Sequence, residues 1–277
     1  MRAVSLFAAL LLSILASPAF AWGPLGHTII AMLAEQRLSL KAELATREIL
    51  LGVPLSNVGN FADDYRASGH PETERWHFVD IPYMADGSEK YDAARDCAVL
   101  ISGDCVIAAI GREPPIFLDA DQNAFARADA LRRLVHWVGD IHQPFHTIER
   151  LQNGKPDRGG NELKLYFFDA ADPTNMHSLW DSGLISQAGM TAEDYVKHLK
   201  ADVIPTLSAT EMAVTDPVQW AMGSHALARA AYVDANLPGK PLPKLTMVYY
   251  TQHITDVDHQ LALAAVRLAN MLNAMFP

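Results

Sequence analysis

The sequence predicts a mainly α-helical protein, a single-domain helical bundle with a small β-hairpin. Apolar residues recur at helical spacing along most of the chain, and only residues 162–168 have the composition of a convincing strand. No internal repeat, low-complexity run or linker divides the 277 residues. A chain of this length, 50% hydrophobic, can bury one substantial core.

Residues 1–21 are expected to be a secretory signal peptide rather than part of the fold. A positive start, Met1-Arg2, precedes an apolar run to about Leu15, and Ala19-Phe20-Ala21 supplies a small-x-small cleavage site. The run is too short for a membrane span. We therefore expect a mature domain over residues 22–277, secreted or periplasmic and without membrane insertion.

The remaining elements are predicted from periodicity and from residues that begin or end helices. Leu131, Leu134, Val135 and Val138 form the apolar stripe of one long helix. Asn60 is a good helix N-cap, with acids in the turn that follows. The helices expected are 28–40, 40–51, one that starts at Asn60, one after the second cysteine, 119–141, 191–207, 218–234 and 249–275.

Residues 76–82 alternate large apolar and polar side chains, which predicts a strand or straight segment. On such a segment His77 and Val79 face one side, and Phe78 and Asp80 face the other. Residues 153–161 form a turn-rich loop before the expected strand.

Cysteine usage and net charge narrow the class of protein. Cys97 and Cys105 are eight residues apart, and behind a signal peptide they are expected to form a local disulfide that shapes a loop. The formal charge is −10, and losing Arg2 with the signal would leave −11. This argues against nucleic-acid binding through a basic surface. Bound metal ions could supply the positive charge at a site instead.

Potential ligands are concentrated in residues 134–146, which place three histidines and one aspartate among apolar side chains. His136 and Asp140 are four residues apart, so they share one face of a helix. Pro144 cannot continue that helix regularly and could turn His146 toward a different ligand set. Burying so many titratable groups is costly unless something pairs with them, and a divalent cation is the natural partner.

Further donors lie elsewhere in the chain. His177 and Asp181 repeat the His-x3-Asp spacing, whereas His142, the remaining histidine of the central motif, is expected to be an ordinary hydrogen-bonded core residue. Cleavage before Trp22 would expose an α-amine that, with the adjacent carbonyl, can chelate a metal, and His27 follows five residues on. Imidazole and carboxylate ligands without thiolate suit zinc, more often at catalytic than at purely structural sites.

These motifs, in this order, resemble the secreted zinc-dependent single-strand-specific nuclease and 3′-nucleotidase family of the mung bean nuclease type, within the phospholipase C/nuclease superfamily. The resemblance covers nearly the whole mature chain and implies that family's fold. The motifs that carry it are Trp22 after Ala-x-Ala, Gly26-His27, Ala62-Asp63-x2-Arg66, Trp76-His77-Phe78-Val79-Asp80, His136-x3-Asp140-x5-His146, Asp157-Arg-Gly-Gly-Asn161, His177-x3-Asp181 and Tyr249-Tyr250.

The resemblance implies three zinc ions, held by residues at the matching positions. One zinc would be held by Asp63, His77 and His136, and Asp140 would bridge it to a second zinc. The second zinc would also be held by His27 and by the amine and carbonyl oxygen of Trp22. The third would be held by His146, His177 and Asp181.

The implied reaction is hydrolysis of phosphodiester bonds in single-stranded DNA and RNA to 5′-mononucleotides, with removal of the phosphate from 3′-nucleotides. Asp63 would orient the nucleophile and Arg66 would contact the phosphate. Phe78 would stack on a base, Asp80 would bind the edge of that base, and Asn161 would help to hold the nucleotide. The residues alone leave simpler roles open: an ion pair for Arg66, a core position for Phe78 and a turn for Asn161.

Two rival functions remain at this point, and no obligate protein partner is evident. A zinc-dependent phospholipase C would share the N-terminal Trp22 and a trinuclear site, but it uses Glu where this chain has Asp181. A secreted zinc-binding protein without catalysis would hold metal and hydrolyse no nucleotide substrate.

Overall fold

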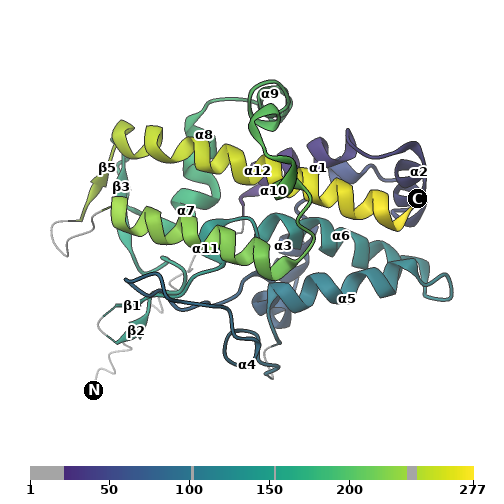
Figure 1. Ribbon diagram of the computed structural model, residues 1–277, viewed down its shortest axis with the longest axis horizontal. Helices are drawn as coiled ribbons and strands as arrows, with labels where there is room; N and C mark the ends of the chain where they lie inside the picture. The colour runs from purple at the N-terminus through teal and green to yellow at the C-terminus, as the bar shows by residue number, and fades with distance from the viewer. Residues whose placement is uncertain (1–21, 101–102, 153, 236–241) are drawn as a thin grey trace, which may run out of the picture.

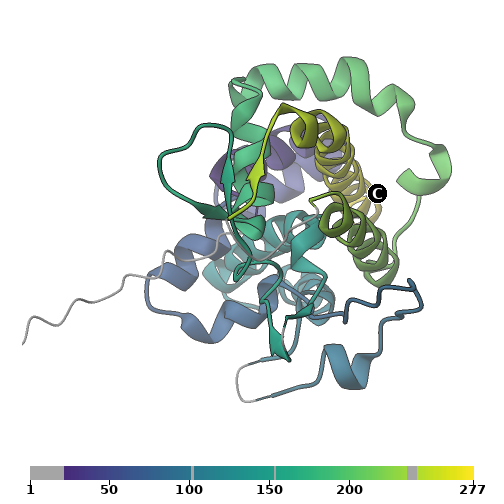
Figure 2. The ribbon, with the colours of Figure 1, turned by 90° about the vertical axis from the view of Figure 1, so that its left-hand side faces the viewer.

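Helices make up most of the computed structural model, which describes residues 22–100, 103–152, 154–235 and 242–277. The expected signal peptide, residues 1–21, lies outside the described residues. The two long helices α11 and α12 run side by side, and α5 packs against α6 on the other side of the molecule (Figure 1). The view in Figure 2 shows a small sheet at one end of these helices. The predicted mainly α fold is confirmed.

The elements follow the order of the sequence. The α-helices are α1 (Pro24–Glu35), α2 (Leu40–Ile49), α3 (Phe61–Ala67), α4 (Ala93–Asp96), α5 (Val106–Leu118), α6 (Ala124–Asp140), α7 (Met176–Ser178), α8 (Leu184–Gln187), α9 (Ala192–His198), α10 (Ala209–Met212), α11 (Pro217–Asp234) and α12 (Met247–Met275). Other helical turns are η1 (Leu55–Asn57), η2 (Pro71–His77), η3 (Pro144–His146), η4 (Leu179–Gly183), η5 (Leu199–Val203) and η6 (Ile204–Thr206).

The expected strand lies at the centre of a three-stranded sheet, with shorter bounds than predicted. Strand β3 (Lys164–Phe167) pairs antiparallel with β4 (Thr174–Asn175) and parallel with β5 (Lys244–Leu245). Strands β1 (Leu151–Gln152) and β2 (Lys155–Pro156) form a separate two-stranded ribbon, so part of the loop expected over residues 153–161 is a short strand.

Helix α6 crosses the core and carries the central motif. Its predicted apolar stripe, Leu131, Leu134, Val135 and Val138, is at most 1% exposed. Burial of each such side chain contributes about 1.5–3 kcal/mol. The helix begins at Ala124 rather than near residue 119, because the Asn123 side chain accepts a hydrogen bond from the Phe125 N–H and caps it.

Buried side chains tie the C-terminal end of α6 to α11 and α12. Ser224 Oγ donates to the Ile141 carbonyl (2.8 Å), and Gln260 Nε2 donates to the His142 carbonyl (3.0 Å). His142 Nδ1 donates to the Val138 carbonyl, and its Nε2 accepts from Arg267 Nη1 (2.8 Å). Both ring nitrogens of His142 therefore have protein partners, as expected of a core histidine.

Three local predictions differ from the structure. The helix expected over 191–207 is instead α9, a π-helical turn η5 and a 3-10 turn η6, because Pro205 has no N–H for a regular helix. His77 ends the 3-10 turn η2, so the straight segment starts only at Phe78 (φ −147°, ψ 172°). Asn60 lies before α3 but makes no side-chain capping bond.

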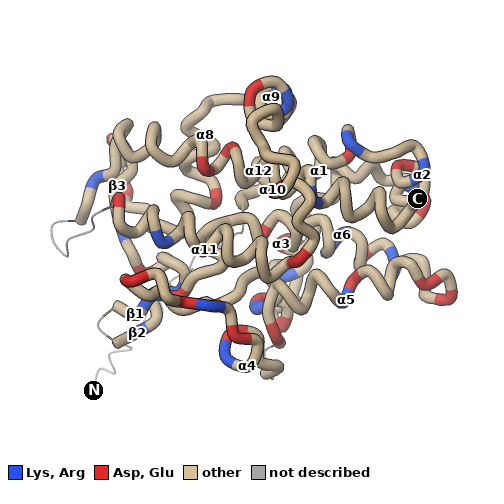
Figure 3. Tube along the Cα trace, in the orientation of Figure 1, with Lys and Arg blue, Asp and Glu red and all other residues tan. Residues whose placement is uncertain are grey.

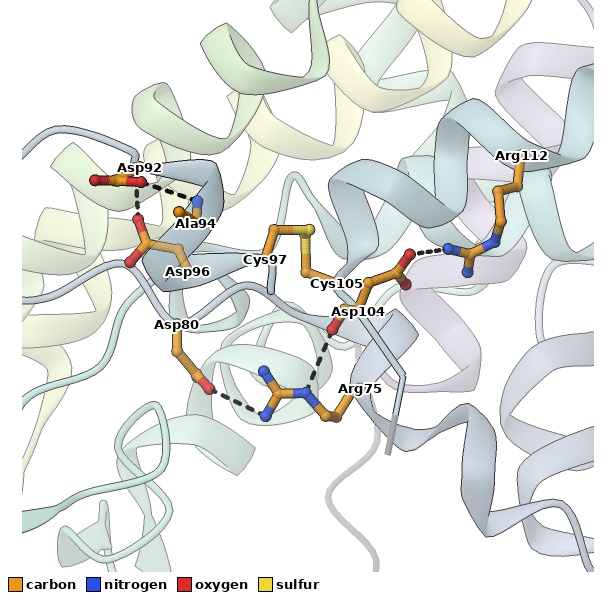
Figure 4. Close-up of a disulfide and its surroundings, with 9 residues drawn as sticks. All are labelled: Arg75, Asp80, Asp92, Ala94, Asp96, Cys97, Asp104, Cys105 and Arg112. Carbon is orange, nitrogen blue, oxygen red and sulfur yellow. Dashed lines mark hydrogen bonds and ion pairs between the residues drawn. A yellow bond between two sulfur atoms is a disulfide. The ribbon is translucent and has the colours of Figure 1, made fainter. Parts of the chain in front are cut away.

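The predicted disulfide between Cys97 and Cys105 is present and joins the loop after α4 to the start of α5 (Figure 4). Within the described ranges, no helix combines the length and apolarity needed to cross a membrane.

Candidate metal centre

Eight histidine and aspartate side chains converge around the C-terminal end of α6. We call His27, Asp63, His77, His136 and Asp140 the paired cluster, and His146, His177 and Asp181 the rim group. Donor atoms lie within 4.8 Å of one another in three sets that could each hold a metal ion: His27, His136 and Asp140; Asp63, His77 and His136; and His146, His177 and Asp181.

The paired cluster is assembled from separate elements around α6. His27 lies in α1, Asp63 in the first turn of α3 and His77 at the end of η2, while His136 and Asp140 occupy successive turns of α6. All five side chains are buried, at most 2% exposed. The helical spacing predicted from the sequence thus brings His136 Nε2 to 3.4 Å from Asp140 Oδ2.

Glycine allows α1 to approach α6 closely enough for this arrangement. A Cβ atom on Gly139 would lie 2.8 Å from His27 Nδ1, and one on Gly59 would lie 2.5 Å from the His27 carbonyl oxygen. With no side chain there, the rings of His27 and His136 stack with centroids 3.7 Å apart. Gly139 therefore helps to set the position of one candidate ligand from within the motif that supplies two others.

The two carboxylate oxygens of Asp140 face different histidines. Oδ1 lies 3.2 Å from His27 Nε2, whereas Oδ2 lies 2.9 Å from His77 Nδ1 and 3.4 Å from His136 Nε2. This is the orientation that a carboxylate shared between two ions requires.

The rim group depends on the break that Pro144 makes after α6. The chain forms one 3-10 turn there, and His146 Nε2 comes to 3.8 Å from Asp181 Oδ1. His177 Nε2 lies 3.6 Å from the other oxygen of Asp181. Gln143, which is fully buried, donates from Nε2 to Asp181 and orients that carboxylate.

Backbone carbonyls orient three of the candidate histidine ligands through the ring nitrogen that faces away from the carboxylates. Nδ1 donates to a backbone carbonyl in His136 (Gly59, 2.8 Å), His146 (His77, 2.7 Å) and His177 (Gly159, 2.8 Å). Each Nε2 is then an acceptor that faces a carboxylate oxygen, also an acceptor. Such a contact is unfavourable unless a cation lies between the two atoms.

The unpaired atoms support the same conclusion. Among the described residues, the buried polar atoms without a hydrogen-bond partner include His27 Nε2, Asp63 Oδ2, His77 Nε2, His136 Nε2, Asp140 Oδ1 and His146 Nε2. Ligand atoms around a tetrahedral zinc are about 3.3 Å apart, from bond lengths of about 2.0–2.1 Å. The contacts that these unpaired atoms make with neighbouring ligand atoms, 3.2–3.8 Å, are of this size, so the residues fit a metal.

Burial sets the protonation of these groups before any metal arrives. Desolvation lowers the pKa of His136 to about 3 and that of His177 to about 4, so both imidazoles are neutral near pH 7, the form that binds metal. It raises the pKa of Asp63 to about 7, against the opposing effect of Arg66, and raises the pKa of Asp140 and of Asp181. A bound cation would favour the ionised form of all three carboxyl groups.

A pocket of about 210 Å³ opens beside the rim group, and both of its histidines line it. His77 is the member of the paired cluster that reaches it, and Arg66, one turn after Asp63, lines it as well. Arg66 Nη2 donates to Asp63 Oδ1 (3.0 Å), so the ion pair considered from the sequence is present. The same guanidinium lines the pocket and could contact a phosphate there.

The alternation predicted for residues 76–82 places two more predicted residues at this pocket. Val79 is buried, whereas Phe78 and Asp80 are partly exposed and line the pocket. Arg75 contacts both, with its Cζ 5.8 Å from the Phe78 ring centroid. Its Nη1 lies 3.9 Å from Asp80 Oδ2 (Figure 4). Burial raises the pKa of Asp80 to about 6, and Arg75 opposes the shift.

Asn161 lines the pocket from the loop before β3. Its Nδ2 donates to the Arg158 carbonyl (2.9 Å), so it is both a turn residue and a wall of the pocket. The carbonyl that receives the His177 Nδ1–H belongs to Gly159 in the same loop.

Trp22, the predicted mature N-terminus, is fully buried. The next residue, Gly23, donates its N–H to the Asp181 carbonyl (2.8 Å), which ties the start of the described chain to the rim group. His27 follows on the first turns of α1.

Sequence reasoning missed several residues around the pocket. Glu74, Glu149 and Arg158 line it, and Gln143 orients Asp181 from behind. Arg158 stands inside a motif that was singled out, between Asp157 and Asn161, so its basic charge was a usable signal. The acids carried none, because only the folding of distant segments brings them together.

Comparison with known proteins agrees with these features. The family model described as S1/P1 Nuclease matches residues 22–277. The chain is 27% identical to nuclease P1 of Penicillium citrinum, over 91% of this chain and 97% of that protein. It is 28% identical to nuclease S1 of Aspergillus oryzae (94% and 93%) and 28% identical to endonuclease 4 of Arabidopsis thaliana (96% and 93%). Together with the site, the match shows that this chain belongs to the S1/P1 nuclease family.

Proposed function

We propose that the protein is a secreted or periplasmic zinc-dependent nuclease that hydrolyses single-stranded DNA and RNA to 5′-mononucleotides and also acts on 3′-nucleotides. The observation that carries the proposal is the pairing of imidazole nitrogens with carboxylate oxygens, acceptor against acceptor, beside a pocket lined by an arginine and an aromatic ring. Family membership and the names of the relatives, nucleases and endonucleases, support it.

The ligands proposed are those implied by the resemblance. Asp63, His77 and His136 would hold one zinc, and Asp140 would share it with a second. Trp22, as a free N-terminus, and His27 would complete that second zinc. His146, His177 and Asp181 would hold the third. The disulfide between Cys97 and Cys105 supports an oxidising compartment, where a signal peptide over residues 1–21 would deliver the protein.

Bound zinc would supply Lewis acidity, which lowers the pKa of water toward ~7 and offsets charge that develops on phosphoryl oxygens. Asp63 would orient the attacking water through its carboxylate. Arg66 would donate N–H groups to a non-bridging phosphate oxygen, as planar guanidinium does to phosphate. Its hydrogen bond to Asp63 holds both side chains in a fixed relation.

The pocket residues would bind the nucleotide next to the reacting phosphate. Phe78 offers a ring on which a base can stack, worth ~1–3 kcal/mol and open to any base. Asp80 would accept hydrogen bonds from the base edge, and Asn161 would hold the nucleotide from the loop side. A base in a duplex is already stacked and paired, so this mode of binding favours single strands.

Zinc counting on protein that begins at Trp22, combined with assays on single- and double-stranded substrates, tests the proposal. We expect about three zinc ions per chain and faster cleavage of single strands. Metal content without hydrolysis of any nucleotide substrate would instead identify a zinc-binding protein. Hydrolysis of phosphatidylcholine alone would identify a phospholipase.

A further inference from the structure

Arg158 is a pocket-lining cation that the proposed reaction does not use. It lies in the loop between β2 and β3 and lines the same pocket as Arg66, Phe78 and His177. Its side chain is 64% exposed, and its Nη1 is 3.8 Å from Glu162 Oε1, also exposed. An exposed pair of this kind contributes little and exchanges readily for another anion.

The backbone at Arg158 is held in a conformation that a non-glycine residue adopts at an energetic cost. Its φ is +55°, and Gly159 (+57°) and Gly160 (+81°) continue the left-handed run. The surroundings enforce this shape: the Arg158 N–H donates to Glu149 Oε1 (2.9 Å) and the Gly160 N–H to Asp157 Oδ1 (3.2 Å). An arginine at a position that glycine or asparagine would occupy more easily points to a use for its side chain.

The loop beneath Arg158 is anchored in the core. Asp157 is fully buried, and its Oδ2 accepts hydrogen bonds from Tyr232 Oη (2.8 Å) and Arg150 Nε (3.2 Å). The Arg150 guanidinium also lies 4.2 Å from the centre of the Tyr232 ring. Arg158 therefore projects from a fixed base at the pocket.

Charge around the pocket gives that cation a role. Glu74 and Asp80 line the pocket and would repel the phosphates of a bound strand, and Glu149 would add to this in its ionised form. Arg66 already donates to Asp63 at the predicted reaction centre. Along the described chain, lysines and arginines elsewhere are interspersed with acids in the view of Figure 3.

We propose that Arg158 forms a second phosphate subsite, which binds the phosphodiester adjoining the scissile one and thereby favours polynucleotides over substrates with a single phosphate. The inference rests on the proposed nuclease function and extends it. Arginine suits this role because its planar guanidinium donates two parallel hydrogen bonds to phosphate. Glu162 would give up its loose contact with Arg158 when a strand binds.

The test compares a thymidine dimer, whose only phosphate is the scissile one, with a single-stranded thymidine octamer. Arg158→Asn removes the charge and suits the left-handed backbone. Arg158→Lys keeps a positive charge but lacks the planar guanidinium that donates two parallel hydrogen bonds. Arg47→Asn is the matched control, since Arg47 is exposed and lies 3.8 Å from Glu43 at the same i,i+4 spacing on α2. Zinc content and melting temperature verify that each variant is folded.

For Arg158→Asn we expect the octamer-to-dimer ratio of kcat/KM to fall about tenfold, through KM, as loss of a hydrogen bond to a charged group implies. The slope of log kcat/KM for the octamer against log salt should become shallower by about 0.7. Arg158→Lys should give a ratio between those of the wild type and Arg158→Asn, and Arg47→Asn should keep the wild-type ratio. An unchanged ratio or salt slope overturns the inference while leaving the nuclease intact. Wild-type protein inactive on both substrates overturns the proposed function and this inference with it.

Discussion

The paired cluster and the rim group contain the same residue types but are built differently. Helices α1, α3 and α6, with the end of η2, supply the paired cluster, whose side chains are at most 2% exposed. The rim group comes from the 3-10 turn η3, from α7 and from the π-helical turn η4, is 3–6% exposed and opens to the pocket. Helical register relates His136 and Asp140 in the first, whereas loop or backbone carbonyls and a buried glutamine orient all three side chains of the second.

This difference separates the tasks of the two regions. The paired cluster is at most 2% exposed and reaches the pocket through His77, so we expect the core elements that supply its ligands to hold its metals. His146 and His177 of the rim group line the pocket, so its metal affinity should respond to changes in the surrounding loops. Variants that affect one region and spare the other therefore test the comparison.

The largest effect is expected for Asp140→Asn, which removes the carboxylate that faces both sides of the paired cluster. Loss of two metals should lower kcat by roughly a thousandfold or more, since each metal contributes several kcal/mol. Metal analysis of the purified variant should find the rim metal retained. Loss of only one zinc would contradict the bridging role.

The next largest effect is expected when one residue is added ahead of Trp22. The extension converts the predicted α-amine ligand into a peptide nitrogen, so most activity and one metal of the paired cluster should be lost. A chain beginning at Trp22, made in parallel, is the control. Full activity of the extended chain would exclude the N-terminal ligand.

A smaller effect, confined to the rim group, is expected for Tyr232→Phe. Tyr232 holds Asp157, whose loop provides the Gly159 carbonyl that orients His177, and loss of such outer contacts typically weakens metal binding 10–100-fold. Tyr195→Phe is the matched control, because Tyr195 Oη donates to Asp258 in another buried pair (2.5 Å).

Zinc titration of both tyrosine variants should show one weakened metal for Tyr232→Phe and none for Tyr195→Phe, although both lose stability. Equal metal binding in the two variants would mean that the loop over residues 157–161, the rim loop, does not depend on Tyr232.

The smallest effect concerns Glu149 in the pocket beside the rim group. Burial raises the pKa of Glu149 to about 7, with Asp80 and Asp157 adding to the shift and the Arg158 N–H opposing it. Between the usual value of about 4.5 and about 7 the folded state binds more protons than the unfolded state, so stability falls as pH rises. Glu149→Gln keeps an oxygen that accepts from the Arg158 N–H, but it has no carboxyl group to titrate and so should not lose stability in this way as pH rises.

Melting curves at pH 5 and pH 8 measure this effect. The variant should gain stability over the wild type as pH rises, by less than about 1 kcal/mol because the group is partly exposed and screened. A difference in stability between variant and wild type that is the same at both pH values would show that the pKa of Glu149 is not raised.

The paired cluster was the more predictable region. His136 and Asp140 could be placed on one helical face because, at 3.6 residues per turn, residues four apart lie on the same side of a helix. The core stripe of α6 follows from the same rule. The approach of His27 depends on Gly139, which has no periodic signature. The side-chain alternation from His77 to Asp80 was predicted even though His77 belongs to a 3-10 turn, because Val79 must be buried in either case.

The surroundings of the rim group could not be predicted in the same way. Gln143 and Glu149 act through partners far along the chain, and contact at that separation has no local sequence pattern. The helix expected over 191–207 was wrong beyond His198, where a π-helical turn and Pro205 interrupt a sequence with helical spacing. The side chains of the rim loop also required the structure, since three successive left-handed residues re-aim the chain.

The bonds from α11 and α12 to the end of α6 affect the order in which the protein can mature. Gln260 and Arg267 hold His142 and its carbonyl from the last helix of the chain, just past the turn that bears Asp140. A nascent chain lacks these contacts until α12 has been made. Because these contacts hold the turn after Asp140, we expect a chain cut short before α12 to retain metal less well than the full chain.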